Sequence, residues 1–140
     1  MCIGNFMLLI DIHPKEIYNW FQIMYIDAYD VFMVPNVYGM LLYGMLDEKN
    51  HMMTRPYFCS SNYLIKMSDY KPLNIFIDEK EHKWNDIMDA LYYRLISNYS
   101  DEFSKIYSTA NAVKTFNNFT TDKKKDLLNL ANVYIKWIHD

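Results

Sequence analysis

Residues 14–25 decide the first element of the fold, and they read PKEIYNWFQIMY. Pro14 suits the first turn of a helix, where its missing N–H would have no intrahelical partner. Apolar residues then recur at steps of three and four and form one face, made of Ile17, Trp20, Phe21, Met24 and Tyr25. The pattern predicts a helix over about residues 14–30 that stops before Pro35, because a residue preceding proline avoids the helical region.

Two later segments show the same helical spacing. Residues 84–103 place an apolar stripe at Ile87, Met88, Leu91, Tyr92, Leu95 and Ile96. We expect Thr121 or Asp122 to cap the last predicted helix and residues 123–126 to form a solvated turn. Its stripe is Leu127, Leu128, Ala131, Tyr134, Ile135 and Ile138.

Connections separate these helices at residues 41–61 and 70–83, and Glu79-Lys80-Glu81-His82 is typical of a solvated loop. The chain has only 3 Gly and 4 Pro and no alternating run of Val, Ile and Thr. We therefore expect an all-α fold that forms a single domain over residues 1–140.

Composition limits the class of protein. A net charge of -3 gives no global basic field that would attract nucleic acid. Cys2 and Cys59 cannot build a disulfide framework, and no apolar run approaches the roughly 18 residues of a membrane span, so we expect a soluble intracellular protein. The four histidines, at positions 13, 51, 82 and 139, show no ligand spacing, so no metal site is expected.

Two acidic residues are the first candidates for a binding site. Asp27 and Asp30 lie three apart near the C-terminal end of the first predicted helix, where they would share a face. A carboxylate is electrostatically unfavourable near the C-terminal end of a helix. Hydrogen bonds donated by the hydroxyl groups of a ligand would compensate for this cost. The alternative is that both side chains cap loops or face water.

An aromatic and basic mixture follows in a segment that we expect to be irregular. Tyr57 and Tyr63 accompany Arg55 and Lys66, a combination that stacks on bases and pairs with phosphates. With 13 Tyr in the chain, aromatic residues near cations also arise by chance.

Several motifs stand in a fixed order. Residues 25–40 read YIDAYDVFMVPNVYGM, Arg55-Pro56-Tyr57 comes next, and residues 61–70 read SNYLIKMSDY. Together they resemble the flavin-binding catalytic domain of the bacterial photolyases and cryptochromes that carry an iron–sulfur cluster. The resemblance implies the helical C-terminal part of that domain, with FAD as cofactor, damaged DNA as partner, and light-driven DNA repair or blue-light sensing as activity.

The resemblance also implies roles for single residues. Asp27 is similar to the acidic residue that hydrogen-bonds the sugar-like chain of the flavin, and Asp30 and Asn36 resemble residues of the flavin pocket wall. Trp20 is similar to the tryptophan that passes an electron to the photoexcited flavin.

Tyr57 and Tyr63 match tyrosines near the entrance for the DNA lesion, and Lys66 lies beside them in the same motif region. A damaged base unstacks readily from the duplex and needs aromatic stacking partners at such an entrance.

The chain departs from the family pattern at several positions. Lys71, Asn74 and approximately Asp86 stand where the family has the cysteines of its cluster, and none of them replaces a thiolate, so we expect no iron–sulfur cluster. Phe21 stands where relatives often have a tyrosine in the electron relay, and Met33 where many have a polar contact to the flavin ring.

The resemblance covers only the later part of such a protein. A complete flavin site needs both halves, so a functional chain would require a separate polypeptide that supplies the N-terminal part. The alternatives are a flavin-free helical interaction module, in which the aromatic segment docks on protein, and a non-functional remnant.

Overall fold

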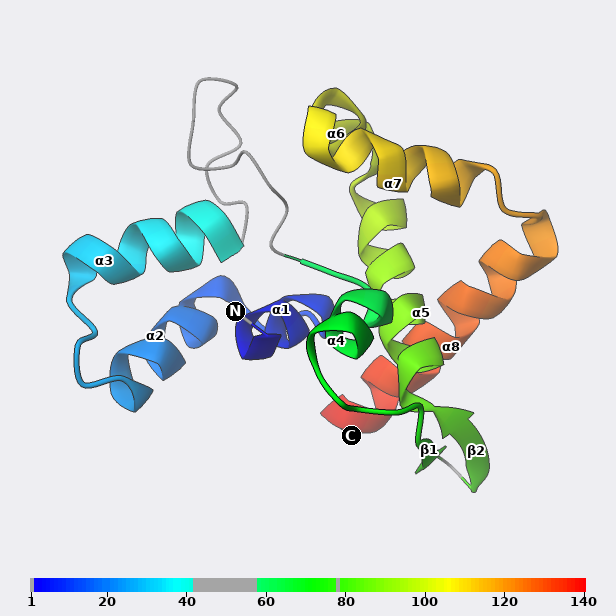
Figure 1. Ribbon diagram of the computed structural model, residues 1–140, viewed down its shortest axis with the longest axis horizontal. Coiled ribbons are helices and arrows are strands. Elements are labelled where there is room, and N and C mark those ends of the chain that lie inside the picture. Colours follow the sequence, from blue (N-terminus) through cyan, green and yellow to red (C-terminus); the bar gives the residue numbers. More distant parts are fainter. Residues whose placement is uncertain (1, 42–57, 78) are drawn as a thin grey trace. The chain divides into compact units, whose positions relative to one another are not determined.

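The computed structural model describes residues 2–41, 58–77 and 79–140. The chain divides into two compact units, Met1–Phe58 (unit 1) and Cys59–Asp140 (unit 2). Both units are helical, and the strands among the described residues form one two-stranded sheet in unit 2 (Figure 1). The predicted all-α fold is confirmed, with this small hairpin added, while the single domain over residues 1–140 stays a prediction.

The described part of unit 1 contains four helical segments. They are α1 (Cys2–Leu9), α2 (Pro14–Met24), α3 (Asp30–Val34) and the π-helix η1 (Pro35–Leu41).

Helix α2 begins where the sequence predicts and ends earlier. Pro14 occupies its first turn, and the side chain of His13 accepts a hydrogen bond from the backbone there. The predicted extension to residue 30 is wrong, because Tyr25 is extended, with φ −115° and ψ 131°, and Asp30 begins α3. The apolar residues that follow Phe21 are exposed, so the apolar spacing in this stretch does not mark a buried helix face.

The stretch from Asp27 to Pro35 differs from the prediction in a second way. Asp27 lies between α2 and α3, so the two acidic residues, Asp27 and Asp30, do not share a helix face. Helix α3 does end before Pro35, but Pro35 itself is helical, with φ −66° and ψ −35°, and opens η1. A proline is tolerated there because the first turn of a helical segment needs no N–H donor.

The core of unit 1 joins α2 to η1. Ile17 and Phe21 of α2 form a buried cluster with Val37 and Leu41 of η1. Helix α1 reaches this core through Gly4, where an added Cβ would lie 3.2 Å from Leu41 Cγ and closer still to Cδ2. The missing side chain of Gly4 therefore lets α1 approach η1 closely.

The described part of unit 2 contains five helices and a hairpin. They are α4 (Ser61–Met67), β1 (Asn74–Ile77), β2 (Lys80–Lys83), α5 (Trp84–Asn98), α6 (Ser100–Lys105), α7 (Tyr107–Asn117) and α8 (Thr121–His139). Helix α5 is central, since α4, α7 and α8 all pack against it (Figure 1). Five of the six residues of its predicted stripe are buried, and Tyr92 is half-buried.

The predicted single helix over residues 84–103 is wrong. Helix α5 ends at Asn98, Tyr99 has φ −120° and ψ 32°, and α6 begins at the next residue. Phe103 is still buried beyond the break at Tyr99. The apolar periodicity therefore continues across the break and does not reveal it. A hydrogen bond between α7 and α6 holds the turn that follows α6, because the Thr109 hydroxyl donates to the Phe103 carbonyl at 2.7 Å.

Helix α8 carries the predicted stripe but a different cap. The Thr120 hydroxyl accepts a hydrogen bond from the Lys123 backbone N–H at 3.4 Å, so Thr120 is the cap instead of Thr121 or Asp122. Ala131 is fully buried and the other five residues of the stripe are half-buried, as expected for a helix that packs on α5.

The first turn of α8 is solvated as the sequence predicts, with Lys123, Lys125 and Asp126 exposed and Lys124 half-buried. Lys123 Nζ lies 4.1 Å from the ring centroid of Phe119, and Lys124 Nζ lies 5.4 Å from that of Phe116. Both lysines therefore cover aromatic rings of the preceding segment with their cationic groups.

Residues 70–83 are not a loop throughout. Strands β1 and β2 pair antiparallel, with Ile77 opposite Lys80 and Asn74 opposite Lys83. Ile77 is 1% exposed and anchors the hairpin. The prediction of a solvated loop at Glu79-Lys80-Glu81-His82 is wrong for its last three residues, which belong to β2. The apolar run of β1 is too short for periodicity to identify it as a strand.

Candidate functional site

Trp20 lies in an aromatic group on α2. The half-buried indole meets the Phe21 ring edge to face at a centroid distance of 5.2 Å and the Tyr25 ring at 6.5 Å. Phe21 and Tyr25 stack at 5.6 Å. This group places an oxidisable indole at the border between the core of unit 1 and its surface.

Asp30 ties α3 to α2 through a polar cluster. Its Oδ1 atom accepts a short hydrogen bond from the Tyr18 hydroxyl and another from Gln22 Nε2 at 2.8 Å. Gln22 Nε2 also donates to the Tyr18 hydroxyl oxygen at 2.7 Å, and the Tyr18 ring stacks on Tyr38 at 5.3 Å. The hydrogen bond to the Asp30 carboxylate raises the pKa of Tyr18, because a phenolate beside a carboxylate is disfavoured.

Asp27 and Asn36 are placed differently from each other. Asp27 is exposed in the connection from α2 to α3, and its backbone carbonyl accepts a hydrogen bond from the Tyr29 N–H at 2.8 Å. Asn36 is exposed on η1, and its Nδ2 donates to the Phe32 carbonyl at 2.7 Å. The structure thus bonds the Asn36 side chain back to α3, the preceding helix, and presents Asp27 at the surface.

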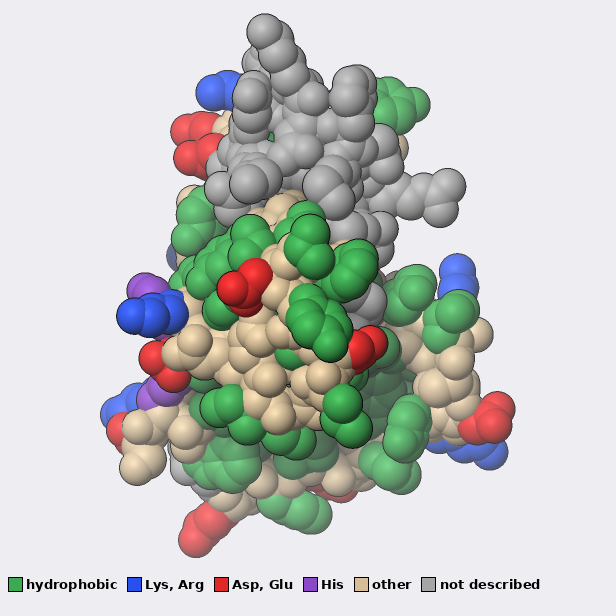
Figure 2. All heavy atoms as spheres, turned by 90° about the vertical axis from the view of Figure 1, so that its left-hand side faces the viewer, with side chains coloured by type: hydrophobic (Ala, Val, Ile, Leu, Met, Phe, Trp, Pro, Cys, Tyr) green, Lys and Arg blue, Asp and Glu red, His purple; other side chains and the backbone are tan. Residues whose placement is uncertain are grey.

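A large apolar surface surrounds these polar residues. Its exposed members, which we name the 23–34 surface, are Ile23, Met24, Tyr25, Ile26, Tyr29, Val31, Phe32 and Val34. Figure 2 views the α2 and α3 side of the chain and shows hydrophobic side chains with isolated acidic groups among them. Exposed apolar side chains that gather in this way are typical of binding or interaction surfaces.

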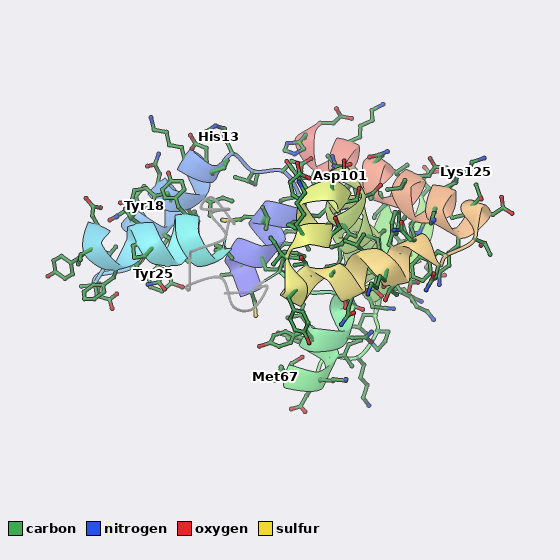
Figure 3. All side chains as sticks on the ribbon, turned by 90° about the horizontal axis from the view of Figure 1, so that it is seen from above. His13, Tyr18, Tyr25, Met67, Asp101 and Lys125 are labelled. Atoms are coloured by element: carbon green, nitrogen blue, oxygen red, sulfur yellow. The ribbon has the colours of Figure 1, made fainter. Side chains whose placement is uncertain are left out.

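Figure 3 labels Tyr18 and Tyr25, which lie on α2 and at its C-terminal end. Tyr18 belongs to the polar cluster around Asp30, whereas Tyr25 belongs to the aromatic group and to the 23–34 surface. The sequence analysis missed Tyr18 and Gln22 as partners of Asp30. Their spacing of four on a helix, which puts both on one face, is the signal that could have found them.

The residues expected to face DNA belong to unit 2 where they are described. Tyr63 and Lys66 lie three apart on α4 and are both exposed, so the expected irregular segment is a helix at this point. Met67 marks the C-terminal end of this helix (Figure 3). Tyr57 and Arg55 lie outside the described residues.

Two other kinds of site find no candidate in the described part of the chain. Within residues 2–41, 58–77 and 79–140, no group of three His, Cys, Asp or Glu side chains could hold a metal ion. No helix in these ranges is long and apolar enough to cross a membrane.

Comparison with known proteins finds similarity to a photolyase. The chain is 30% identical over 138 residues to a (6-4) photolyase of Agrobacterium fabrum, an alignment that covers 97% of this chain and 26% of the photolyase. The chain therefore resembles one region of a photolyase and spans about a quarter of its length. No protein-family model matches the chain.

A second relative is similar in length. An uncharacterized protein of Acanthamoeba polyphaga mimivirus is 39% identical over 110 residues, which cover 76% of this chain and 80% of the viral protein. The chain belongs to the same family as this viral protein.

Proposed function

We propose that the chain contributes part of an FAD site to a light-driven protein of the photolyase and cryptochrome type, which repairs damaged DNA or senses blue light. The similarity to a (6-4) photolyase along almost the whole chain carries the proposal. The 23–34 surface supports it, because a region that belongs to a larger assembly exposes apolar area when described alone.

The residues around Asp27 suit a flavin. An exposed carboxylate can accept hydrogen bonds from the hydroxyl groups of the flavin side chain, and Ile26 and Phe32 offer exposed apolar contacts to a flat ring. Asp30 and Asn36 would shape the pocket wall by holding α3 and η1 in place. Bound FAD supplies light absorption and one-electron transfer.

Trp20 is the electron donor in this proposal. Its half-buried position within the aromatic group limits access of water to the indole while keeping the ring near the surface. Phe21 has no hydroxyl proton to lose on oxidation, so it is a poor relay from Trp20.

On unit 2, Tyr63 and Lys66 would face the damaged DNA. The exposed phenol ring can stack on a base, and the lysine on the same helix face can pair with a phosphate. Tyr57 joins them in this proposal on the resemblance alone. A separate polypeptide would supply the remaining part of the flavin site.

Two variants test the assigned roles in a complex of the chain, FAD and a polypeptide that comprises the rest of the photolyase. Asp27→Ala should weaken FAD binding about tenfold or more, because it removes a charged hydrogen-bond acceptor. Asp126→Ala, which removes an exposed carboxylate from α8, is the matched control. Equal FAD affinity for wild type and Asp27→Ala would remove Asp27 from the site.

Trp20→Phe should slow photoreduction of the bound flavin and leave FAD affinity nearly unchanged. Phenylalanine keeps an aromatic ring in the group on α2 but is much harder to oxidise. An unchanged rate of photoreduction would exclude Trp20 as the donor.

A second function, a flavin-free interaction module, is favoured by one observation. Asp30 and Asn36 are both hydrogen-bonded within unit 1, as purely structural residues would be. In that case the purified chain is colourless and folds cooperatively, and FAD does not change its thermal stability. A yellow protein with flavin absorbance would contradict it.

A further inference from the structure

Tyr18 carries a phenol whose hydroxyl group has a proton acceptor already in place. The hydroxyl donates a short hydrogen bond to Asp30 Oδ1. Gln22 Nε2 donates to the phenol oxygen at 2.7 Å and to Asp30 Oδ1 at 2.8 Å. A phenol that loses one electron becomes a strong acid, so its oxidation is easiest where a positioned base receives the proton at once. The carboxylate of Asp30 is such a base.

The ring of Tyr18 is held between α2 and η1. It stacks on the ring of Tyr38 at a centroid distance of 5.3 Å, with 27° between the ring planes, and both rings are half-buried. After transfer of the proton to Asp30, the phenol oxygen would still accept the hydrogen bond from Gln22, and the protonated carboxyl group would donate back to it. Few groups have to move, which favours charge transfer at this position.

Tyr18 and Trp20 border the same apolar core of unit 1. Both side chains are partly buried and pack against one buried cluster, which consists of Ile17, Phe21, Val37 and Leu41. The two residues stand two positions apart on α2, about 3 Å along the axis and on opposite sides of a helix roughly 10–12 Å across. Electrons tunnel between aromatic groups over such separations in a protein interior. An electron can therefore pass from Tyr18 to an oxidised Trp20.

Tyr25 is the competing phenol. Its ring centroid lies 6.5 Å from that of the Trp20 indole, and the residue is 45% exposed. No side chain in the described part of the chain accepts a hydrogen bond from its hydroxyl group. Of these two phenols near Trp20, Tyr18 is therefore the one with a carboxylate positioned for its proton.

We propose that Tyr18 is a second redox-active residue, which reduces the oxidised indole of Trp20 while its phenolic proton passes to Asp30. One electron leaves the Tyr18 ring and restores neutral Trp20. The O–H bond of Tyr18 breaks, the proton binds to Asp30 Oδ1, and the products are a neutral tyrosyl radical and a carboxylic acid. The oxidant is the indole radical cation that remains once Trp20 has given an electron to light-excited flavin, so the inference rests on the proposed function.

The proton transfer gives this step its use. Return of the electron to Tyr18 requires the proton to come back from Asp30 as well, so recombination of the separated charges is slowed. The electron that Trp20 has donated then stays longer with its acceptor. Tyr18 and Asp30 act in this way on the lifetime of the separated charges, without a contact to the flavin.

Flash photolysis of the full chain tests the step without flavin. Light-excited tris(bipyridine)ruthenium with a cobalt(III) electron acceptor supplies the oxidant, and transient absorption follows the tryptophan and tyrosyl radicals. We expect a phase in which a tryptophan radical decays as a tyrosyl radical appears. Tyr18→Phe and Trp20→Phe should each abolish this phase. Tyr25→Phe, the matched control, removes a phenol that also lies near Trp20 and should leave the phase in place.

Variants of Asp30 test the proton acceptor. Asp30→Asn should slow the phase roughly tenfold or more, because a positioned base contributes on the order of a hundredfold or more to proton transfer. Asp30→Glu keeps the carboxylate and should recover most of the rate. Deuterated water should slow the phase in the wild type, since the electron and the proton move together. Far-UV circular dichroism checks that each variant keeps its helical content.

Spin trapping separates proton transfer from a merely structural role. A nitroso trap marks tyrosyl radicals, and peptide mapping by mass spectrometry assigns each adduct to a residue. Tyr107 on α7, which is 96% exposed, serves as the reference in the same sample. Asp30→Asn should lower the adduct at Tyr18 relative to Tyr107, whereas mere loosening of α3 would expose the Tyr18 ring and raise it.

Two results would overturn the proposal. One is a tryptophan radical whose decay is the same in Tyr18→Phe and in the wild type, and the other is an adduct ratio that stays unchanged or rises in Asp30→Asn. Because the oxidant is external, neither result depends on FAD binding. A failed FAD titration would therefore count against the proposed function and leave this test in force.

Discussion

Gly4→Ala sets two opposing effects against each other in the core of unit 1. Alanine favours the helical conformation of α1 over glycine by about 1 kcal/mol. The new methyl group would however lie 3.2 Å from Cγ and Cδ1 of Leu41 and closer still to Cδ2. Leu41 is 2% exposed and packed with Ile17, Phe21 and Val37, so it cannot turn aside freely.

Overpacking of this kind costs about 1–3 kcal/mol, which exceeds the gain in helix propensity. We therefore expect Gly4→Ala to lower the free energy of unfolding by about 1 kcal/mol. Urea unfolding followed by far-UV circular dichroism measures the change as a lower midpoint at constant slope.

A second background separates the two effects. In Leu41→Ala the obstructing side chain is absent, so adding Gly4→Ala should raise stability by up to about 1 kcal/mol through helix propensity. Opposite signs in the two backgrounds are the signature of the close approach. If Gly4→Ala stabilises the protein by the same amount in both, the contact between α1 and η1 does not constrain this position.

Three further predictions concern single side chains. Burial raises the pKa of Tyr92 to about 12, so the unfolded state loses this proton first as the pH rises. The stability of wild type relative to Tyr92→Phe should therefore fall between about pH 10 and 12, by at most about 3 kcal/mol, in urea unfolding measured at each pH. Thr120→Ala should destabilise α8 by about 1 kcal/mol in thermal unfolding, whereas Thr121→Ala should change little; equal losses would refute Thr120 as the cap. Asp30→Asn should lower the pKa of Tyr18 toward its ordinary value in an NMR titration, and an unchanged pKa would mean that the carboxylate does not hold the phenol.

The helical fold could be predicted where the apolar spacing continues along a buried face. The stripes of α5 and α8 meet this condition, and both were found. The break at Tyr99 could not be predicted, because Phe103 beyond it is buried and keeps the apolar period; the Thr109 hydroxyl holds the next turn, between α6 and α7. Periodicity records which residues are buried and not which contacts bend the chain.

The candidate site was predictable in part. The sequence identifies Asp27 and Asp30 as an acidic pair, but it treats them as equivalent. The structure separates them, since Asp30 is bonded to Tyr18 and Gln22 while Asp27 is exposed in a connection. This difference depends on where α2 ends, and the exposed apolar residues after Phe21 continue the helical spacing past that end with no helix-breaking residue to mark it.

Titration of the chain with FAD, followed by quenching of flavin fluorescence, tests the central claim most directly. It is made with the chain alone and with a polypeptide that comprises the remaining part of the photolyase. The account predicts saturable one-to-one quenching when both polypeptides are present, with a weaker effect or none for the chain alone. Absence of quenching in both mixtures would contradict a flavin site and leave Trp20, Asp27, Asp30 and Asn36 with structural roles.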